Sequence, residues 1–366
     1  MLAAVLHGFN DLRIEAVPDP RPAPDECLLQ VDCVQPSITE AMLIAGHRMS
    51  LHEHLADRLG AGPVQFGGHE FAATVLDTGA DAAIPPGTRV VAAETVTCGR
   101  CSGCLAGREA ACTAPSYLGF TRPGAFAELV AVPVRNLLPV PPSLSDGEVA
   151  ALQPLVGALH AHRAARLSPG ASVLVIGTGV MGLLALQVAR RGNAGPVVAL
   201  GRTPPKLDLA RRLGADHAVT PGDLDRITAD VTAGRGFDVV IETAGGAPAA
   251  GLSGAATVAT AAAAVSRGGT IVVVSVLPSD SALPLDVLRE KGVTVRHPLS
   301  GRHDGGADLF AHALRLVARG DVDLAGLLTH RLEGITELPN ALDMIVDKKA
   351  HGVINPPQVH LTAEVS

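Results

Sequence analysis

The spacing of hydrophobic positions changes once along the chain, near residue 154. Before that point, short apolar or alternating runs are separated by Pro, Gly and Asp, which is typical of β-strands joined by turns. These strand-like runs occupy residues 28–34, 70–76, 88–96 and 125–132. The first part of the chain is therefore predicted to be rich in β-structure.

Beyond residue 154 the apolar runs alternate between strand length and helix length. A continuous run at 172–177 is followed by a helical pattern at 180–191, and this order repeats up to residue 276. Continuous apolar strands that alternate with helices predict a parallel sheet covered on both faces. The Ala-rich stretch 255–265 lies between two of these strands, so we expect it to form a buried helix.

The last part of the chain returns to shorter elements. Helical patterns at 307–320 and 337–348 flank a strand-like segment at 327–332. A length of 366 residues favours more than one domain. We expect a β-rich domain at 1–153, an α/β domain at 154–298, and a C-terminal segment, 299–366, that completes the first domain.

Composition and charge limit the class of partner. Hydrophobic residues make up 47% of the chain, but no uninterrupted apolar run is long enough to cross a bilayer, so we do not expect membrane insertion. A net charge of -7 with scattered Lys and Arg argues against a nucleic-acid partner. The chain shows no secretory leader, and we expect a cytoplasmic protein that acts on a small molecule.

Four cysteines lie close together in the sequence. Two residues separate each of the first three, so a tight loop can bring three thiolates around one ion, and the last closes the fourth corner. This spacing predicts a closed, tetrahedral structural zinc. Two disulfides or four unrelated thiols are the alternative, which a cytoplasmic location disfavours. The predicted ligands are Cys98, Cys101, Cys104 and Cys112.

A glycine-rich turn follows the first strand of the α/β domain. Gly177 permits the tight turn, Gly179 lets the backbone approach a pyrophosphate, and Gly182 allows the helix to pack closely on the strand. The positive end of the helix dipole then faces the phosphates. The residues predicted to bind a dinucleotide here are Gly177, Gly179, Val180, Met181 and Gly182.

The end of the next strand bears on which dinucleotide is used. NAD sites usually place an Asp or Glu there, which accepts hydrogen bonds from the ribose 2'-hydroxyl. This chain has Gly201 followed by Arg202, with Lys206 four residues later. A glycine leaves room for a 2'-phosphate and Arg202 can bind it, so the sequence favours NADP(H). Stacking of Arg202 on the adenine, or its solvation, is the alternative.

The four-cysteine loop, the GHE motif at 68–70 and the dinucleotide segment together resemble the medium-chain, zinc-type alcohol dehydrogenase family, over essentially the whole chain. Residues 151–161 are similar to the E-P-L segment of its polyol and threonine dehydrogenase branch. The resemblance implies an α/β protein with a GroES-like, β-rich catalytic domain and a Rossmann dinucleotide-binding domain, separated by a cleft. It also implies hydride transfer to or from a carbinol or carbonyl carbon, in a homodimer or homotetramer.

The resemblance implies a catalytic zinc as well, but this chain departs from the family pattern there. Ser37 occupies the position of a cysteine ligand, and Cys33 lies four residues too early to replace it. Gln153 occupies the position of a glutamate, while His69 and Glu70 are retained. A neutral hydroxyl is a poor zinc ligand, so we expect no tightly bound catalytic zinc.

The remaining family positions suggest acid–base chemistry. Thr39 matches the family hydroxyl that relays a proton, although an ordinary turn-capping role is the alternative. Without a zinc, His69 can act as a general acid with Glu70 orienting it. The alternative is that His69 only forms hydrogen bonds to Glu70 or to backbone groups inside the domain. The candidate catalytic residues are Ser37, Thr39, His69 and Glu70.

The stretch 47–67 is longer than the resemblance leads us to expect. Its histidines, His47, His52 and His54, could face the cleft and supply a metal ligand. Its spacing also fits an amphipathic surface helix, which we favour.

Three functional hypotheses follow. The first is an NADPH-dependent oxidoreductase that acts on a small hydroxyl or carbonyl compound with a degenerate catalytic zinc site. The second keeps the hydride but reduces an activated C=C or C=N bond. The third is a non-catalytic sensor or scaffold protein that binds the dinucleotide.

Overall fold

The computed structural model describes residues 1–246, 253–277, 281–298, 303–304, 307–348 and 350–362. It divides into two compact units. Unit 1 comprises Met1–Gln153 and Gly301–Ser366, and unit 2 comprises Pro154–Ser300. Within the described ranges, no helix combines the length and the apolar character needed to cross a membrane.

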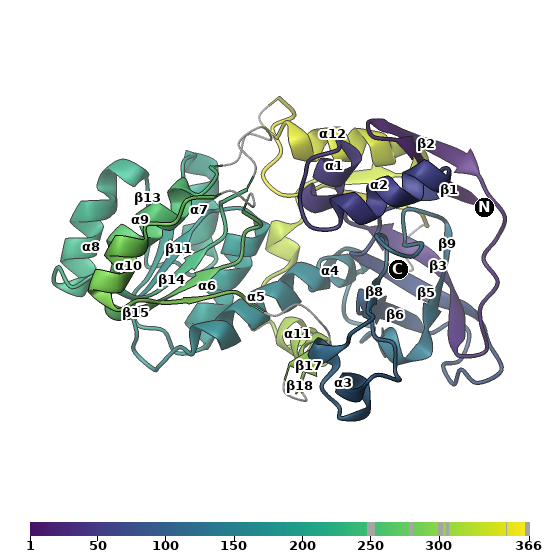
Figure 1. Cartoon of the computed structure of the whole chain (residues 1–366), viewed down its shortest axis with the longest axis horizontal. Helices are drawn as coiled ribbons and strands as arrows, with labels where there is room; N and C mark the ends of the chain where they lie inside the picture. The colour runs from purple at the N-terminus through teal and green to yellow at the C-terminus, as the bar shows by residue number, and fades with distance from the viewer. Residues whose placement is uncertain (247–252, 278–280, 299–302, 305–306, 349, 363–366) are drawn as a thin grey trace. The chain divides into compact units, whose positions relative to one another are not determined.

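Unit 1 is built mainly from short antiparallel strands, as Figure 1 shows. Its strands are β1 (Leu2–Gly8), β2 (Asp11–Ala16), β3 (Glu26–Val34), β4 (Val64–Gln65), β5 (Phe71–Thr78), β6 (Arg89–Ala92), β7 (Thr95–Val96), β8 (Ser116–Tyr117), β9 (Leu129–Pro133), β10 (Leu137–Pro139), β17 (His303–Asp304), β18 (Ala307–Asp308), β19 (Arg331–Glu333) and β20 (Gln358–His360). Its helices are α1 (Ile38–Ile44), α2 (His52–Ala61), α3 (Ser102–Leu105), α4 (Asp146–Ala150), α11 (Leu309–Ala318) and α12 (Leu338–Val346), and α5 (Leu152–Ala165) begins in this unit.

The main sheet of unit 1 joins the two ends of the chain. Its strand order is β10-β6-β5-β3-β20-β19, and β9 also pairs with β3. Because β20 pairs antiparallel with β3 through Val359 and Val34, the C-terminal segment lies beside the strand that leads into α1. Buried Val, Leu, Ala and Phe side chains from these strands and from α12 form one apolar core.

The tail contains less strand than its apolar pattern indicated. The segment 327–332 is strand-like in sequence, but β19 begins only at Arg331. Ala325–Leu327 instead form a single 3₁₀ turn, and the carboxylate of Asp323 accepts a hydrogen bond from the Gly326 N–H at 2.7 Å. This local cap favours the turn that includes Leu327, and residues 328–330 are neither helix nor strand, so the predicted strand is shorter than expected.

Unit 2 contains a six-stranded parallel sheet in the order β13-β12-β11-β14-β15-β16, the order of a classical dinucleotide-binding fold. The strands are β11 (Val173–Ile176), β12 (Val197–Leu200), β13 (His217–Val219), β14 (Phe237–Glu242), β15 (Val265–Val273) and β16 (Thr294–Arg296). The helices are α6 (Val180–Arg191), α7 (Pro204–Arg212), α8 (Leu224–Thr232), α9 (Ala256–Ala264) and α10 (Leu285–Lys291).

Right-handed crossovers place α6 and α7 on one face of this sheet and α8, α9 and α10 on the other (Figure 1). Side chains of α8, α9 and α10 share an apolar core with the strands, which confirms the buried Ala-rich helix. The structure thus has the predicted organisation, a β-rich unit and a unit with the parallel sheet of a Rossmann fold.

Candidate functional site

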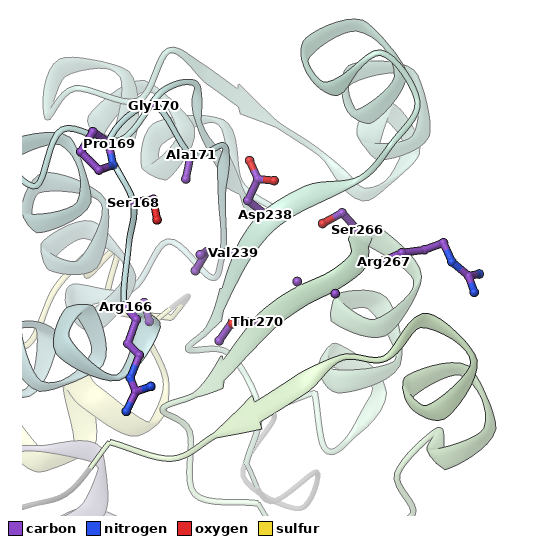
Figure 2. A pocket seen from close by; sticks show the side chains of 13 residues that line it. Arg166, Ser168, Pro169, Gly170, Ala171, Asp238, Val239, Ser266, Arg267 and Thr270 are labelled. Carbon is purple, nitrogen blue, oxygen red and sulfur yellow. The ribbon is translucent and has the colours of Figure 1, made fainter.

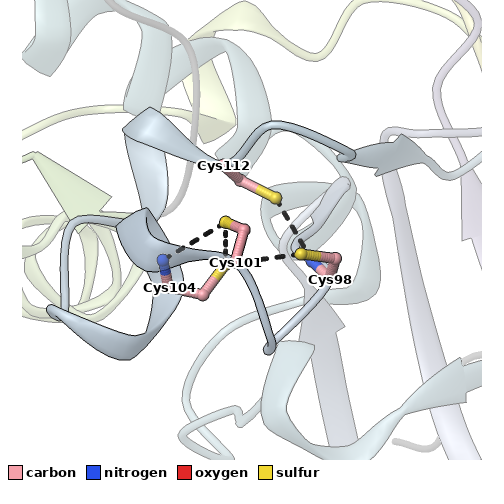
Figure 3. Close-up of side chains that lie close together, drawn as sticks. All are labelled: Cys98, Cys101, Cys104 and Cys112. Atoms are coloured by element: carbon pink, nitrogen blue, oxygen red, sulfur yellow. Dashed lines mark hydrogen bonds between the residues drawn. The ribbon is translucent and has the colours of Figure 1, made fainter.

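The four predicted zinc ligands converge in one loop of unit 1 (Figure 3). All four sulfur atoms lie within 4.8 Å of one another. The Sγ atoms of Cys101 and Cys104 are 3.5 Å apart, and those of Cys98 and Cys104 are 3.9 Å apart. Four thiolates at Zn–S distances of about 2.3 Å in a tetrahedron have sulfurs about 3.8 Å apart, so this cluster has the size that zinc requires.

Backbone N–H groups of this loop favour a thiolate at Cys101, whereas desolvation and the neighbouring thiols raise the pKa of Cys104 to about 11. Cys101 is the N-cap residue of α3, and its Sγ accepts a hydrogen bond from the Cys104 N–H. N–H groups of Cys104 and Thr113 lower the pKa of Cys101 to about 5. The Cys98 N–H donates to the Sγ of Cys112 at 3.3 Å. N–H groups that point at sulfur stabilise the negative charge a metal ligand carries, so the loop is suited to a structural zinc.

The glycine-rich turn of unit 2 connects β11 to α6. Gly177 has φ +111°, which favours glycine over other residues. A Cβ at Gly182 would lie 1.9 Å from the Gly177 carbonyl oxygen, so this helix turn packs directly on the strand end. A Cβ at Gly179 would meet no atom within 4 Å, which leaves an open approach to the backbone. Val180 and Met181 form the first turn of α6, whose N–H groups face this opening. The turn has the form that a pyrophosphate requires.

Gly201 follows β12 at the position that determines the type of dinucleotide. A Cβ there would lie 2.6 Å from Oγ1 and 2.7 Å from Cγ2 of Thr178. A side chain at 201 would therefore require the Thr178 side chain to move. Arg202 is exposed, and Lys206 lies in the first turns of α7. Burial and the neighbouring Arg202 charge lower the pKa of Lys206, which indicates two cations close together.

His69 is held by a glutamate that the sequence analysis did not single out. Its Nδ1 lies 2.8 Å from Oε1 of Glu40, and the same oxygen accepts a hydrogen bond from the Gly68 N–H at 2.6 Å. Glu40 is fully buried. The Nε2 of His69 lies 3.6 Å from Oε1 of Glu70, which is longer than a hydrogen bond. Glu40 rather than Glu70 thus orients the imidazole.

The pKa values of His69 and of the glutamates beside it differ from their ordinary values. Burial disfavours the imidazolium, but the carboxylates of Glu40, Glu70 and Glu94 outweigh it and raise the pKa of His69 to about 9. Burial raises the pKa of Glu70 to about 7, against the opposing effect of the His69 charge. Burial would also raise the pKa of Glu40, but His69 and the N–H donors of Ser37 and Gly68 lower it. His69 thus lies between two carboxyl groups whose pKa values are shifted in opposite directions, lowered for Glu40 and raised for Glu70.

Ser37 caps a helix instead of offering a metal ligand. Its Oγ accepts a hydrogen bond from the Glu40 N–H at 3.3 Å, and its N–H donates to Oε2 of Glu40 at 2.8 Å. This is a capping box, S-x-x-E, at the start of α1. The spacing of Ser37 and Glu40 was visible in the sequence and could have identified Glu40 as a second partner in this region.

Three further residues that the sequence drew attention to, Thr39, Gln153 and Cys33, make no hydrogen bond to His69 among the described residues. Thr39 is half-buried in the first turn of α1, and its hydroxyl makes no hydrogen bond to a described residue. Gln153 is the second residue of α5 and is half-buried. Cys33 is fully buried, and its Sγ lies 3.6 Å from Nε2 of His360.

The donor set around His69 lacks the thiolate of a catalytic zinc site. The Ser37 hydroxyl is engaged as a cap, whereas His69 presents Nδ1 to Glu40, as a metal-ligating histidine commonly does, and leaves Nε2 open. In the described part of the chain, the four cysteines are the one group of three or more metal-ligating side chains that lie close enough to share an ion.

The long stretch 47–67 contains α2, which confirms the amphipathic helix favoured from its spacing. His52 is buried and stacks on Phe9 with ring centroids 5.0 Å apart, His54 is exposed, and His47 is half-buried. The guanidinium of Arg58 donates to the Phe120 carbonyl oxygen.

Phe120 connects α2 to His69. Its ring lies 4.8 Å from the His69 ring, centroid to centroid, and 5.8 Å from the ring of Phe66. Leu55 of α2 belongs to the same apolar cluster. The helix therefore forms part of the apolar wall beside the imidazole, which keeps water from the Glu40–His69 pair.

A hollow of about 460 Å³ lies in unit 2 at the amino-terminal ends of β14 and β15 (Figure 2). Gly177 follows the carboxyl end of β11, so this hollow lies at the opposite edge of the sheet from the dinucleotide turn. Arg166 and Arg267 at its rim point away from each other (Figure 2). The Asp238 carboxylate is engaged by the N–H and hydroxyl of Ser172, each at 2.8 Å. These groups do not converge on a common ligand position.

Comparison with known proteins gives matches along most of the chain. The alcohol dehydrogenase GroES-like domain family matches residues 23–142, and the zinc-binding dehydrogenase family matches residues 180–319. Sorbitol dehydrogenase of Bacillus subtilis (strain 168) is 33% identical over 295 residues, which cover 78% of each chain. L-threonine 3-dehydrogenase of Rhizobium etli (strain CIAT 652) is 31% identical over 271 residues, 73% of this chain and 74% of that one.

A solved structure from Sinorhizobium meliloti 1021, which carries the description zinc-binding dehydrogenase and is bound to NADP, has a TM-score of 0.83. Its sequence identity is 28%, and the match covers 98% of this chain and 99% of that chain.

Proposed function

Since the chain belongs to the zinc-type alcohol dehydrogenases of the medium-chain dehydrogenase family, and is therefore an oxidoreductase, we propose that it moves a hydride between NADP(H) and a small hydroxyl or carbonyl compound without a catalytic zinc. The observation that carries this proposal is the buried Glu40–His69 pair beside a serine that caps a helix. A cation fixed at this point can stabilise negative charge on a substrate oxygen.

In the proposed reaction, the bound dinucleotide supplies or accepts the hydride. His69 supplies the proton in the direction of reduction: its Nδ1 is held by Glu40, so the N–H that remains for a substrate oxygen is at Nε2. Glu70 is the nearest carboxyl group to that atom and can return a proton to it. The apolar wall that includes Phe120 keeps water away from the imidazolium during this transfer.

The preference for NADP(H) rests on residues 201 to 206. Gly201 stands where an acidic side chain would bind a free 2'-hydroxyl, any side chain there would have to displace that of Thr178, and two cations, Arg202 and Lys206, follow it. The related structure from Sinorhizobium meliloti 1021 is bound to NADP, which supports the same choice. The test is Arg202→Ala with both cofactors. We expect KM for NADPH to rise by about tenfold or more while KM for NADH changes little. Equal losses for the two cofactors would contradict a phosphate-binding role.

The proposed metal content is one zinc per chain, held by the four cysteines. Elemental analysis of the purified protein measures it directly. Two tightly bound zinc ions per chain would overturn the proposal for the catalytic site. In that case, the zinc contents of Cys112→Ser and His69→Gln would show which residue holds which ion.

The substrate class is tested with NADPH and three sets of compounds: simple ketones and aldehydes, conjugated enones, and imines. Consumption of NADPH with the first set supports the proposal. Turnover confined to conjugated C=C or C=N compounds would replace it with the alternative function, which also needs no zinc-bound alkoxide.

We also propose that the chain self-associates through the dinucleotide-binding unit. β16 is an edge strand of its sheet, and Val295 in that strand and Leu285 in α10 are exposed apolar residues. Sedimentation analysis of the wild type and of Val295→Lys tests this: we expect a dimer or tetramer that the substitution dissociates, whereas a monomeric wild type would contradict it.

A further inference from the structure

Glu242 is the last residue of β14, and its side chain is fully buried. Its Oε1 accepts hydrogen bonds from the N–H groups of Ala244 and Gly245, each at 2.7 Å. Its Oε2 accepts a hydrogen bond from the hydroxyl of Ser275. A buried carboxylate is costly unless its oxygens are satisfied, and these three donors occupy both of them. Glu242 therefore ties the backbone that follows β14 to the segment that follows β15.

The sheet register places Glu242 in the middle of three strand ends. It is paired with Ile176 at the end of β11 and with Val273 at the end of β15. The Glu242 carbonyl oxygen also accepts a hydrogen bond from the N–H of Val274 at 2.8 Å. Because parallel strands end at the same edge of a sheet, these bonds lie at the carboxyl edge, on the same side as the glycine-rich turn.

Thr243 connects the same segment to the glycine-rich turn. Its N–H and its hydroxyl both donate to the Ile176 carbonyl oxygen at 2.9 Å. A Cβ at Gly177 would lie 2.6 Å from Oγ1 of Thr243, and a Cβ at Gly182 would lie 2.9 Å from the same atom. The Thr243 hydroxyl thus fills the space that these two glycines leave. Residues 243–245 are held by the turn at one end and by Glu242 at the other.

The strand order indicates which part of a dinucleotide passes over this segment. A doubly wound sheet binds a dinucleotide across the carboxyl ends of its strands, at the point where the strand order reverses, with one nucleotide half on each side. Here that point lies between β11 and β14. Gly201 and Arg202 follow β12, on the adenosine side. Residues 243–245 follow β14, so they lie on the nicotinamide side.

We infer that Glu242 and Ser275 are positioning residues for the nicotinamide half of the dinucleotide. They act through residues 243–245, whose backbone they fix at the sheet edge over which that half lies. The inference rests on the proposed function only for the choice of NADP(H) as the dinucleotide.

Glycine at 245 is required for this arrangement. A Cβ there would overlap Oγ of Ser275 and would lie 2.6 Å from a methyl carbon of Leu277. Gly245→Ala therefore separates the Ser275 hydroxyl from Glu242 without altering either residue.

The test is calorimetric titration of the full-length protein with NADP⁺ and with 2',5'-ADP, which contains the adenosine half and lacks the nicotinamide. In Ser275→Ala the Kd for NADP⁺ should rise about fivefold or more, because Glu242 loses one hydrogen bond and the segment it fixes is loosened. The Kd for 2',5'-ADP should stay within about twofold of the wild-type value, since Arg202 and the glycine-rich turn are untouched.

The controls separate positioning from general damage to the fold. Ser275→Thr keeps the hydroxyl and should retain the NADP⁺ affinity, whereas Gly245→Ala should reproduce the selective loss. Ser266→Ala, at a half-buried position near the opposite end of β15, should change neither affinity.

Equal losses for NADP⁺ and 2',5'-ADP in Ser275→Ala would overturn the inference, as would an unchanged affinity for NADP⁺. A wild type that binds NAD⁺ more tightly than NADP⁺ would contradict the proposed cofactor but not the positioning role, which is then tested in the same way with NAD⁺ and 5'-AMP. The titrations require no turnover, so their outcome is independent of whether a substrate is found.

Discussion

The Glu40–His69 pair allows one prediction to be worked out in detail, with Glu40→Gln as the perturbation. The pKa of His69 rises from an ordinary value of 6.5 to about 9 in the folded protein. Because one pH unit corresponds to about 1.4 kcal/mol, the protonated pair contributes on the order of 3 kcal/mol to folding. A folded-state pKa above the unfolded value means that this contribution is complete below pH 6.5 and is lost as the pH rises through 9.

The assay is equilibrium unfolding in urea followed by circular dichroism, since the chain contains no Trp. Between about pH 7 and 9 the wild-type free energy of unfolding should fall by up to about 1.4 kcal/mol per pH unit from this pair. Glu70, with a pKa raised to about 7, and Cys101, with a pKa lowered from 9 to about 5, also titrate in or near this window, so the His69 contribution is read from the difference between the wild type and Glu40→Gln. Glu40→Gln should lose about 3 kcal/mol at pH 7 and show no such fall.

A matched control exists in the same unit. Ser145 and Glu148 form a second capping box at the start of α4, without a buried histidine. Glutamine also serves at this position of a capping box, so Glu148→Gln should cost less than about 1 kcal/mol and keep the wild-type pH dependence. Equal losses for the two variants, or an unchanged pH dependence in Glu40→Gln, would refute the reasoning.

Two further predictions concern the backbone and the metal. Gly68→Ala combines φ +86° with a Cβ placed 2.2 Å from the Phe126 backbone nitrogen, so it should lower the free energy of unfolding by more than about 2 kcal/mol. Gly87→Ala, with φ +82° in open space, should cost about 1 kcal/mol, and equal losses would show that the contact with Phe126 is unimportant. Cys112→Ser should remove the zinc and lower the melting temperature, whereas Cys27→Ser should retain the zinc; unchanged zinc content in Cys112→Ser would contradict the assignment of the loop.

The spacing of apolar residues along the sequence predicted most of the fold, because it reflects which faces of the helices and strands are buried. The helical pattern at 180–191 and the Ala-rich helix both correspond to helices in unit 2, α6 and α9. The segment 327–332 was harder, because the Gly326 N–H donates a hydrogen bond to Asp323 and favours a 3₁₀ turn that includes Leu327, so the strand begins only at Arg331.

The candidate site was less predictable than the fold because its contacts join distant parts of the chain. The spacing of Ser37 and Glu40 indicates a capping box. It does not reveal that the other oxygen of the Glu40 carboxylate contacts His69, which is 29 residues away. Gln35 and Gln358 are 323 residues apart in sequence, and nothing local in either segment indicates that they meet. Such pairings follow from strand register, which brings β20 beside β3.

The capping box at Ser37 also bears on how position 37 can be varied. A cysteine there would keep a side-chain acceptor at the start of α1, as Cys101 does at the start of α3, and would leave Glu40 in contact with His69. The first turn of α1 is therefore compatible with either a hydroxyl or a thiol, so a thiol can be introduced beside His69 without giving up the cap.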